Sequence, residues 1–307
     1  MAKPTTLSII VPIHNEEENI LPLIDAIFEH VKDLSFEILF IDDGSNDNSL
    51  VVLEEACSKI ESLKVISFTR NFGQTAALAA GIQNSSGTYI ATLDGDLQND
   101  PQDILPMLKL CSENVDIVSG YRKNRNDHFL RVRVSNIANS IVSKMTGLQL
   151  HDYGCSIKVY KRDTLADIKL YGEMHRFLPI YAHLKGAKVS EFVVNHHPRH
   201  KGTSKYGYQR TLRVCLDIVL FYFLFHSKKP LNFFSKFSYF FFFLSTLLFI
   251  QYTFSLDIVY LVLLCFSTQF IVYPLLFALI LELIIRTHYL SQSESQFIIS
   301  TKVNFNS

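Results

Sequence analysis

The sequence has no excess of either charge, no paired cysteine motif and no apolar N-terminal segment long enough for a signal peptide. Lysine plus arginine and aspartate plus glutamate each number 29 among 307 residues, so the basic excess typical of a nucleic-acid-binding protein is missing. The five cysteines are scattered without a Cys-x-x-Cys pair, which argues against a disulfide framework or a zinc site. The first apolar run, Leu7–Val11, is too short for a secretory leader, so we expect the N-terminal part to stay in the cytoplasm.

Apolar residues are abundant, at 48% of the chain with a mean hydropathy of +0.18, and they concentrate after residue 230. Phe237–Leu256 is a run of 20 residues without a charge, and Ile258–Leu281 is a run of 24. Each run can cross a hydrocarbon core of about 30 Å at about 1.5 Å per helical residue. With only Asp257 between them, they predict a two-helix transmembrane hairpin within a membrane anchor at 227–290.

The basic residues around this hairpin predict its orientation. Lys228, Lys229 and Lys236 precede the first span and Arg286 follows the second, which places both outer ends in the cytoplasm. Residues 291–307 then form a cytoplasmic tail. The alternative is a buried core hairpin in a soluble protein, which two uncharged runs of this length disfavour.

Residues 1–226 alternate between short apolar runs and segments with helical periodicity. This alternation indicates an α/β domain with a mostly parallel sheet and helices on both faces. Ligands bind such sheets beyond the carboxyl ends of the strands, where polar clusters fall in this sequence. The strand candidates are Leu7–Val11, Glu37–Ile41, Lys64–Phe68, Thr88–Leu93 and Val115–Ser119, and the helix candidates beside them are Asn19–Val31 and Leu50–Ile60.

Two further segments, 129–145 and 211–225, mix basic and apolar residues. Each fits a helix lying on the membrane surface with its basic groups toward lipid phosphates. Each fits an ordinary amphipathic packing helix equally well.

Two carboxylates, Asp94 and Asp96, follow the fourth strand candidate. Residues two apart at a strand end point to the same side, and Gly95 between them allows the backbone to turn closely around a ligand. Carboxylate oxygens suit Mg²⁺ or Mn²⁺, which would counter the charge of a diphosphate leaving group. A bare Asp-x-Asp also arises by chance, so the inference depends on its position after a buried strand.

Each of three other polar segments is consistent with a structural role or with a functional one. Asp42 and Asp43 lie at the end of the second strand candidate. One aspartate suffices for a turn or a helix cap, and the other could bind the base or the ribose hydroxyls of a nucleotide. The acidic turn at His151–Cys155 is of a kind that is usually structural. The basic segment Pro198–Tyr206 is either a solvated charge run or a loop that closes over phosphates.

Taken in order, these segments resemble the inverting glycosyltransferase family 2, and within it the polyprenyl-phosphate glycosyltransferases, such as dolichyl-phosphate mannose synthase and bactoprenol glucosyltransferases. The resemblance implies a GT-A fold on the cytoplasmic face of a bacterial inner membrane. It is carried by VPIHNEEENI, IDDGSNDNS, RNFGQTAALAAGI, ATLDGDLQNDP, SGYR, HDYGCSIKVYKR, HRFLPIYAHLKGAKVSE and HHPRHKGTSKYG.

The resemblance also implies roles for single residues. It implies nucleotide binding by Pro12, Glu16, Asp42, Asp43 and Asp94, a Mg²⁺ or Mn²⁺ site at Asp94, Asp96 and Gln98, an acceptor-phosphate site at Arg122, Arg131 and Ser135, a catalytic Asp152, and a donor-diphosphate loop with Arg199 and Lys205.

The implied reaction is transfer of a sugar, with inversion, from a nucleotide sugar to a polyprenyl phosphate such as undecaprenyl phosphate. The acceptor phosphate is already anionic, so Asp152 is expected to orient groups or stabilise positive charge more than to remove a proton. His14 stands where relatives often have tyrosine, which leaves open how the base stacks. HDYGC departs from the Ser-Gly-Phe-Arg form of mannose synthases, so GDP-mannose is not favoured. The DYGC form resembles bacterial enzymes that act on undecaprenyl phosphate with UDP-sugars, including the aminoarabinose transferases. Relatives often assemble as homo-oligomers.

Two alternatives are a processive enzyme of the same superfamily and a protein of another class. A processive polysaccharide synthase carries a Gln-x-x-Arg-Trp motif, and this chain has no tryptophan. A non-catalytic membrane partner of a glycan pathway would not need Asp94, Asp96 and Asp152, and all three are present.

Overall fold

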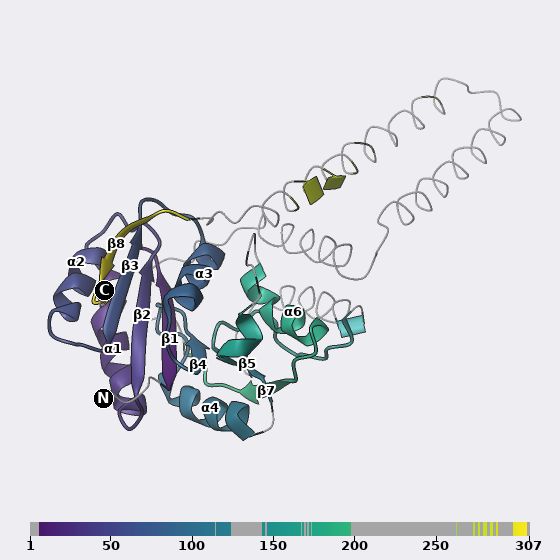
Figure 1. Cartoon of the computed structure of the whole chain (residues 1–307), viewed down its shortest axis with the longest axis horizontal. Helices are drawn as coiled ribbons and strands as arrows, with labels where there is room; N and C mark the ends of the chain where they lie inside the picture. The colour runs from purple at the N-terminus through teal and green to yellow at the C-terminus, as the bar shows by residue number, and fades with distance from the viewer. Residues whose placement is uncertain are drawn as a thin grey trace, which may run out of the picture. The chain divides into compact units, whose positions relative to one another are not determined.

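The computed structural model in Figure 1 describes residues 6–113, 115–123, 143–144, 146–166, 168, 170, 172, 174–197 and 297–305, with single helical positions between 262 and 287. The chain divides into two compact units. The first unit is Met1–Tyr206 together with Ser295–Ser307, and the second is Gly207–Glu294.

The first unit is built on a mixed sheet in the order β7-β5-β6-β4-β1-β2-β3-β8. Its middle strands β4, β1, β2 and β3 are parallel to one another, whereas β6 and β8 run antiparallel to their neighbours. The strands are β1 (Leu7–Ile13), β2 (Phe36–Asp42), β3 (Leu63–Phe68), β4 (Tyr89–Thr92), β5 (Ile117–Tyr121), β6 (Lys158–Lys161), β7 (Val189–Val193) and β8 (Ile299–Val303).

The five strands predicted from apolar runs are confirmed as β1 to β5, with small shifts at their ends. Continuous runs of this kind are typical of parallel strands covered on both faces, and β1 and β2 are buried along nearly their whole length. The helices are α1 (Glu17–Val31), α2 (Ser49–Cys57), α3 (Gln74–Asn84), α4 (Ile104–Glu113) and α6 (Leu178–Leu184), with short 3₁₀ helices η1 (Pro101–Asp103), η2 (Arg162–Leu165) and η3 (Met174–Arg176).

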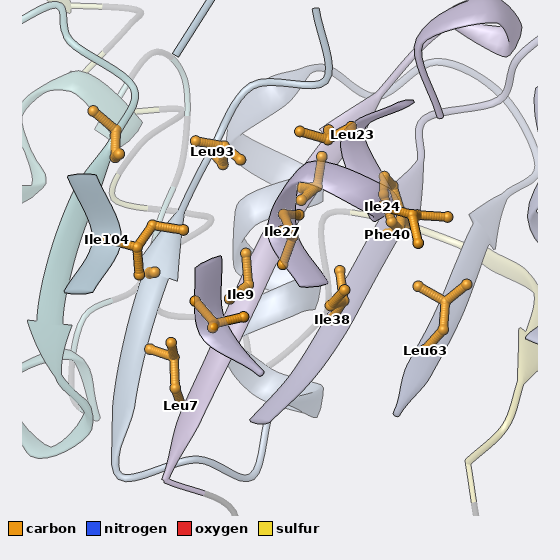
Figure 2. Close-up of a cluster of buried hydrophobic side chains, with 14 of the residues drawn as sticks. Leu7, Ile9, Leu23, Ile24, Ile27, Ile38, Phe40, Leu63, Leu93 and Ile104 are labelled. Atoms are coloured by element: carbon orange, nitrogen blue, oxygen red, sulfur yellow. The ribbon is translucent and has the colours of Figure 1, made fainter. Parts of the chain in front are cut away.

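Helices cover both faces of the sheet, as the alternation predicts. On one face, side chains of α1, α2 and α4 join the odd-numbered residues of β1 in one apolar cluster (Figure 2). On the other face, α3 packs so closely that a Cβ on Gly81 would overlap the side chain of Ile10. A helix–strand contact this close requires glycine at that position.

Strand β8 lies in the stretch where the sequence predicts only a tail. It pairs antiparallel with β3 and covers that edge of the sheet (Figure 1). Phe297 stacks on Phe68 with ring centroids 5.0 Å apart, and Asn304 Nδ2 donates to the carbonyls of Cys57 and Leu63, both at 2.9 Å. The chain that leaves the first unit after Tyr206 therefore returns to it at Ser295.

The predicted spans 237–256 and 258–281 lie outside the described residues, apart from single positions in the second. Among the helices that the structure does describe, none is long and apolar enough to cross a membrane.

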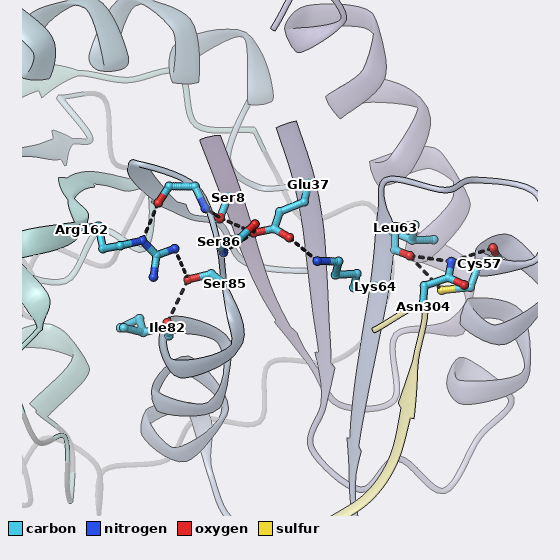
Figure 3. A network of polar contacts seen from close by, with 11 residues as sticks. Ser8, Glu37, Cys57, Leu63, Lys64, Ile82, Ser85, Ser86, Arg162 and Asn304 are labelled. Carbon is cyan, nitrogen blue, oxygen red and sulfur yellow. Dashed lines mark hydrogen bonds and ion pairs between the residues drawn. The ribbon is translucent and has the colours of Figure 1, made fainter. Parts of the chain in front are cut away.

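A buried polar network joins the beginnings of β1, β2 and β3 to the turn before β4, at the amino-terminal ends of the parallel strands (Figure 3). Glu37 is 3% exposed. Its carboxylate accepts from Ser8 Oγ at 2.6 Å, Ser86 N–H at 2.5 Å and Lys64 Nζ at 2.7 Å. Burial would raise the pKa of Glu37, but the hydrogen bonds from Lys64, Ser8 and Ser86 together lower it.

Replacing Glu37 with alanine should destabilise the protein by about 3 kcal/mol, because it leaves a partly buried ammonium and several donors without their acceptor. Thermal unfolding of the full-length protein in detergent should show a Tm lower by roughly 5–10 °C. Glu54→Ala, on the exposed side of α2, is the control and should change stability by less than about 0.5 kcal/mol. Equal shifts in the two variants would contradict this account of the network.

Candidate active site

The Asp94–Gln98 segment follows β4 at the carboxyl end of the parallel strands. Gln74, the first residue of α3, donates from Nε2 to Asp94 Oδ1 at 2.9 Å. The backbone N–H of Gln98 donates to Asp96 Oδ1 at 3.2 Å. A Cβ on the buried Gly95 would lie 2.7 Å from Ile13 Cγ2, so close packing against β1 explains this glycine.

Leu97 holds an unusual backbone conformation between Asp96 and Gln98. Its φ of 59° lies in the left-handed region, which a bulky side chain rarely adopts. The side chain packs against the apolar cluster beneath the sheet. Hydrophobic burial therefore fixes the turn that carries the two polar side chains.

Arg122 and Asp152 form a two-point ion pair, and the charge of Asp94 also acts on Arg122. Arg122 Nε donates to Asp152 Oδ2 at 2.7 Å, and Nη2 donates to Oδ1 at 3.0 Å. Both side chains are mostly buried, with exposures of 11% and 8%. Burial would lower the pKa of the Arg122 guanidinium, but the hydrogen bonds and charge of Asp152 outweigh it and raise the pKa. Arg122 therefore stays charged.

The antiparallel strand β6 explains how these residues meet. Its first residue, Lys158, pairs with Thr92 of β4 on one side and with Ser119 of β5 on the other. Asp94 and Arg122 lie just beyond those partners along their strands, and Asp152 lies in the turn before β6.

Lys158 is a buried cation within this cluster. It is 4% exposed, and its Nζ donates to the backbone carbonyl of Cys155. Burial lowers the pKa of Lys158, while the charges of Asp152 and Asp94 act in the opposite direction. Sequence reasoning missed this residue, because a lysine between apolar residues carries no signal of burial.

Asp42 and Asp43 are buried, with exposures of 1% and 4%. Asp42 Oδ2 accepts from Ser67 Oγ at 2.8 Å. Asp43 accepts from the backbone N–H groups of Phe72 at 2.6 Å and Gly73 at 2.9 Å. Burial raises the pKa of Asp43, and these backbone donors lower it in part. Both carboxylates shape the loops around the site, and their nucleotide contacts stay predictions.

Pro12 and Glu16 lie at the carboxyl end of β1 and in the loop after it. The backbone N–H of Glu16 donates to Ser49 Oγ at 3.0 Å, and its Oε2 accepts from Asn19 Nδ2 at 2.6 Å. Contacts with the first turns of α1 and α2 thus give Glu16 a defined position after the carboxyl end of β1.

Four predicted site residues lie outside the described part of the chain: Arg131, Ser135, Arg199 and Lys205. The same holds for 211–225 and for most of 129–145, the two segments predicted to lie on the membrane surface.

The donor set fits a hard divalent cation. Among the described residues, no group of three or more histidine, cysteine or acidic side chains could hold a metal ion. Mg²⁺ needs fewer protein ligands than that, because it commonly binds through one or two carboxylates plus waters and substrate phosphates. Asp94 and Asp96, together with the amide of Gln98, meet this requirement.

His175 supports the first turn of α3, next to Gln74. Its Nδ1 lies 2.7 Å from Thr75 Oγ1. Burial lowers the pKa of His175 well below its ordinary value, and the charges of Arg176 and Lys158 lower it further. The ring is therefore neutral in the folded protein at neutral pH.

The depressed pKa of His175 predicts a pH-dependent stability. Below about pH 6.5 the unfolded chain binds a proton at this residue that the folded protein excludes, so stability falls by up to about 1.4 kcal/mol per pH unit. The Tm measured between pH 7.5 and 5.5 should fall more steeply in the wild type than in His175→Asn, which does not titrate there. Parallel Tm profiles would show that His175 makes no such contribution.

Comparisons with known proteins identify relatives of this chain. Residues 8–169 match the family described as Glycosyl transferase family 2. The chain is 42% identical over 238 residues to a dodecaprenyl-phosphate galacturonate synthase of Rhizobium johnstonii, covering 75% of this chain and 70% of the relative. It is 34% identical to an undecaprenyl-phosphate 4-deoxy-4-formamido-L-arabinose transferase of Proteus mirabilis, covering 71% and 68%.

Solved structures share the fold at low sequence identity. A mannosyltransferase from Pyrobaculum calidifontis, in complex with GDP-Man and Mn²⁺, aligns with a TM-score of 0.51 at 18% identity, covering 73% of this chain and 66% of that one. A glucosyl-3-phosphoglycerate synthase from Mycobacterium tuberculosis, with Mn²⁺, UDP and phosphoglyceric acid, aligns with a TM-score of 0.54 at 18% identity, covering 71% and 78%. The order of the motifs, the GT-A-like sheet and the family match agree, and the chain belongs to glycosyltransferase family 2.

Proposed function

We propose that this protein transfers one sugar from a nucleotide sugar to a polyprenyl phosphate such as undecaprenyl phosphate. The observation that carries the proposal is the charged Arg122, which Asp152 fixes at two points and on which the charge of the metal-binding candidate Asp94 also acts. Arg122 would face one anionic group of the substrates, and a metal held by Asp94 and Asp96 would face the other. The names of both relatives combine a polyprenyl phosphate with a sugar, which supports a polyprenyl phosphate and a sugar donor as the substrates here.

In the proposed reaction, a phosphate oxygen of the lipid attacks the anomeric carbon. The bond from that carbon to the donor diphosphate breaks, and the nucleoside diphosphate leaves with the electron pair. Attack from the face opposite the leaving group inverts the anomeric centre. Asp94, Asp96 and Gln98 would hold Mg²⁺ or Mn²⁺, which supplies counter-charge to the leaving diphosphate.

Asp152 acts on this reaction through Arg122. Both of its carboxylate oxygens accept hydrogen bonds from the guanidinium, so the carboxylate is already engaged by a cation. The acceptor phosphate has no proton that must be removed. No hydrogen bond joins Nη1 of Arg122 to the described residues, and in this proposal Nη1 would contact the acceptor phosphate, as Arg131 and Ser135 would. Arg199 and Lys205 would contact the donor diphosphate.

The proposed site of action is the cytoplasmic face of a bacterial inner membrane. Strand β8 supports the proposed hairpin topology, because the stretches before and after 207–294 belong to one folded unit, so that the segment would have to cross a membrane an even number of times. Apolar side chains at helical positions of this segment are 49–64% exposed, as side chains facing lipid would be: Val262, Tyr273, Ile280 and Ile284. The division at 226 and 290, and a homo-oligomer, belong to the same proposal.

A donor panel tests the proposed function. Full-length protein in detergent is incubated with UDP- and GDP-sugars, undecaprenyl phosphate and Mg²⁺ or Mn²⁺, and nucleoside diphosphate release is measured with and without the lipid. We expect lipid-dependent release from at least one UDP-sugar. Nucleoside diphosphate release that is independent of the lipid for every donor would contradict the proposed acceptor.

A further inference from the structure

Glu191, on strand β7, contacts the turn that carries Asp152. Its Oε1 accepts from the backbone N–H of His151 at 2.7 Å and from that of Asp152 at 3.2 Å. Its Oε2 lies 2.7 Å from Nδ1 of His151. One carboxylate therefore holds two successive peptide N–H groups and the adjacent imidazole.

The strand pairing explains why Glu191 reaches this turn. β7 runs parallel to β5, and Glu191 pairs with Ser119, two residues before the end of β5 at Tyr121. The ring of Tyr121 stacks on His151 with centroids 5.0 Å apart and planes 28° apart. The turn therefore contacts the middle of β7 through Glu191 and the carboxyl end of β5 through Tyr121.

The contacts of Glu191 point to a role beyond holding an edge strand in place. The Glu191 side chain is 15% exposed, so its hydrogen bonds are partly shielded from water. The position of the 151–152 backbone sets the position and direction of the Asp152 side chain. The two-point contact with Arg122 depends on that direction. An error of about 1 Å at such a site can cost a hundredfold in rate.

We propose that Glu191 is a positioning residue for transfer, which aligns Asp152, and through it Arg122, by holding the backbone of the 151–152 turn. The proposal rests on the proposed function for its effect on rate. The claim that Glu191 holds the turn is independent of that function, because its hydrogen bonds to the two N–H groups form without substrate.

Amide hydrogen exchange of the full-length protein, without substrate, tests the structural part. In Glu191→Ala, peptides covering residues 149–155 should exchange about tenfold faster, because the acceptor of two N–H groups is lost. Glu191→Gln keeps an oxygen that accepts from both groups and should stay close to the wild type. Ser190→Ala, on the opposite face of the same strand, controls for a general loosening of β7. Unchanged exchange in Glu191→Ala would overturn the proposal.

Steady-state kinetics test the catalytic part. For Glu191→Ala we expect kcat to fall tenfold to a hundredfold, by about the effect of a misplaced group, while KM for the nucleotide sugar stays within about twofold. Glu191→Gln should recover most of the rate. An equal fall in kcat for Glu191→Gln, or a KM that rises in proportion to the fall in kcat, would overturn the positioning role. If the wild type transfers no sugar at all, the proposed function fails. Amide hydrogen exchange of residues 149–155 still decides whether Glu191 holds the turn.

Discussion

Replacing Arg122 with lysine is expected to lower kcat for sugar transfer by about 10²–10³-fold, the range seen when one charge-stabilising donor is removed from an active site. Lysine keeps the positive charge but cannot donate two parallel hydrogen bonds to one carboxylate. Asp152 would lose its two-point contact, and the cation beside the acceptor phosphate would lose its fixed direction. Rates are measured with saturating donor and lipid, and UDP affinity, measured by titration, should stay within about twofold.

A double variant separates this account from one in which Asp152 removes a proton. If Asp152 acts by holding Arg122, then Arg122→Lys combined with Asp152→Asn should be no slower than the worse single variant, because the pair works as one unit. Losses that multiply would instead indicate independent roles. Lys123→Ala, at the exposed residue next to Arg122, is the control and should keep nearly full activity.

Asp96→Asn is expected to abolish transfer, with a loss of at least about 10³-fold, because an amide is a poor ligand for a hard divalent cation and the leaving diphosphate loses its counter-charge. EDTA should have the same effect on the wild type, and added Mg²⁺ or Mn²⁺ should reverse it. The Asp96 side chain is partly exposed, so we expect Tm to change little.

Asp25→Asn, on the exposed side of α1, provides the matched control for the amide substitution and should transfer sugar at the wild-type rate. Full activity of Asp96→Asn, or of the wild type in EDTA, would remove the metal from the account.

The sequence predicts the parallel half of the sheet well, because β1 to β5 are apolar runs next to helical periodicity. It misses β6, β7 and β8 for physical reasons. Lys158 and Lys161 begin and end the short β6, which gives this buried strand a polar appearance. β7 and β8 lie at the two edges of the sheet and are only partly buried, so their apolar signal is weak.

The residues of the site were easier to predict than their partners. Arg122 and Asp152 are each predicted as functional, but for separate tasks, and they lie 30 residues apart in the chain. Only the antiparallel pairing through β6 brings them into contact. Glu191 and Lys158 carry no motif, and their contacts become visible only once β6 and β7 are placed in the sheet.

Strand β8 changes how the membrane segment should be tested. A truncation at residue 236 removes the predicted spans, but it also removes the strand that covers the edge of β3 and the ring of Phe297 that stacks on Phe68. A loss of activity in that truncation would therefore mix loss of the anchor with damage to the folded unit. Substitutions within 237–281 avoid this ambiguity.

The mass of the lipid product tests the central claim most directly. Full-length protein is incubated with undecaprenyl phosphate, the active nucleotide sugar and Mg²⁺, and the organic phase is analysed by mass spectrometry. Transfer of the sugar alone predicts a lipid with one phosphate and one sugar, formed in equal amount with nucleoside diphosphate. A lipid diphosphate-sugar formed with nucleoside monophosphate, or no sugar-bearing lipid with any donor, would contradict the account.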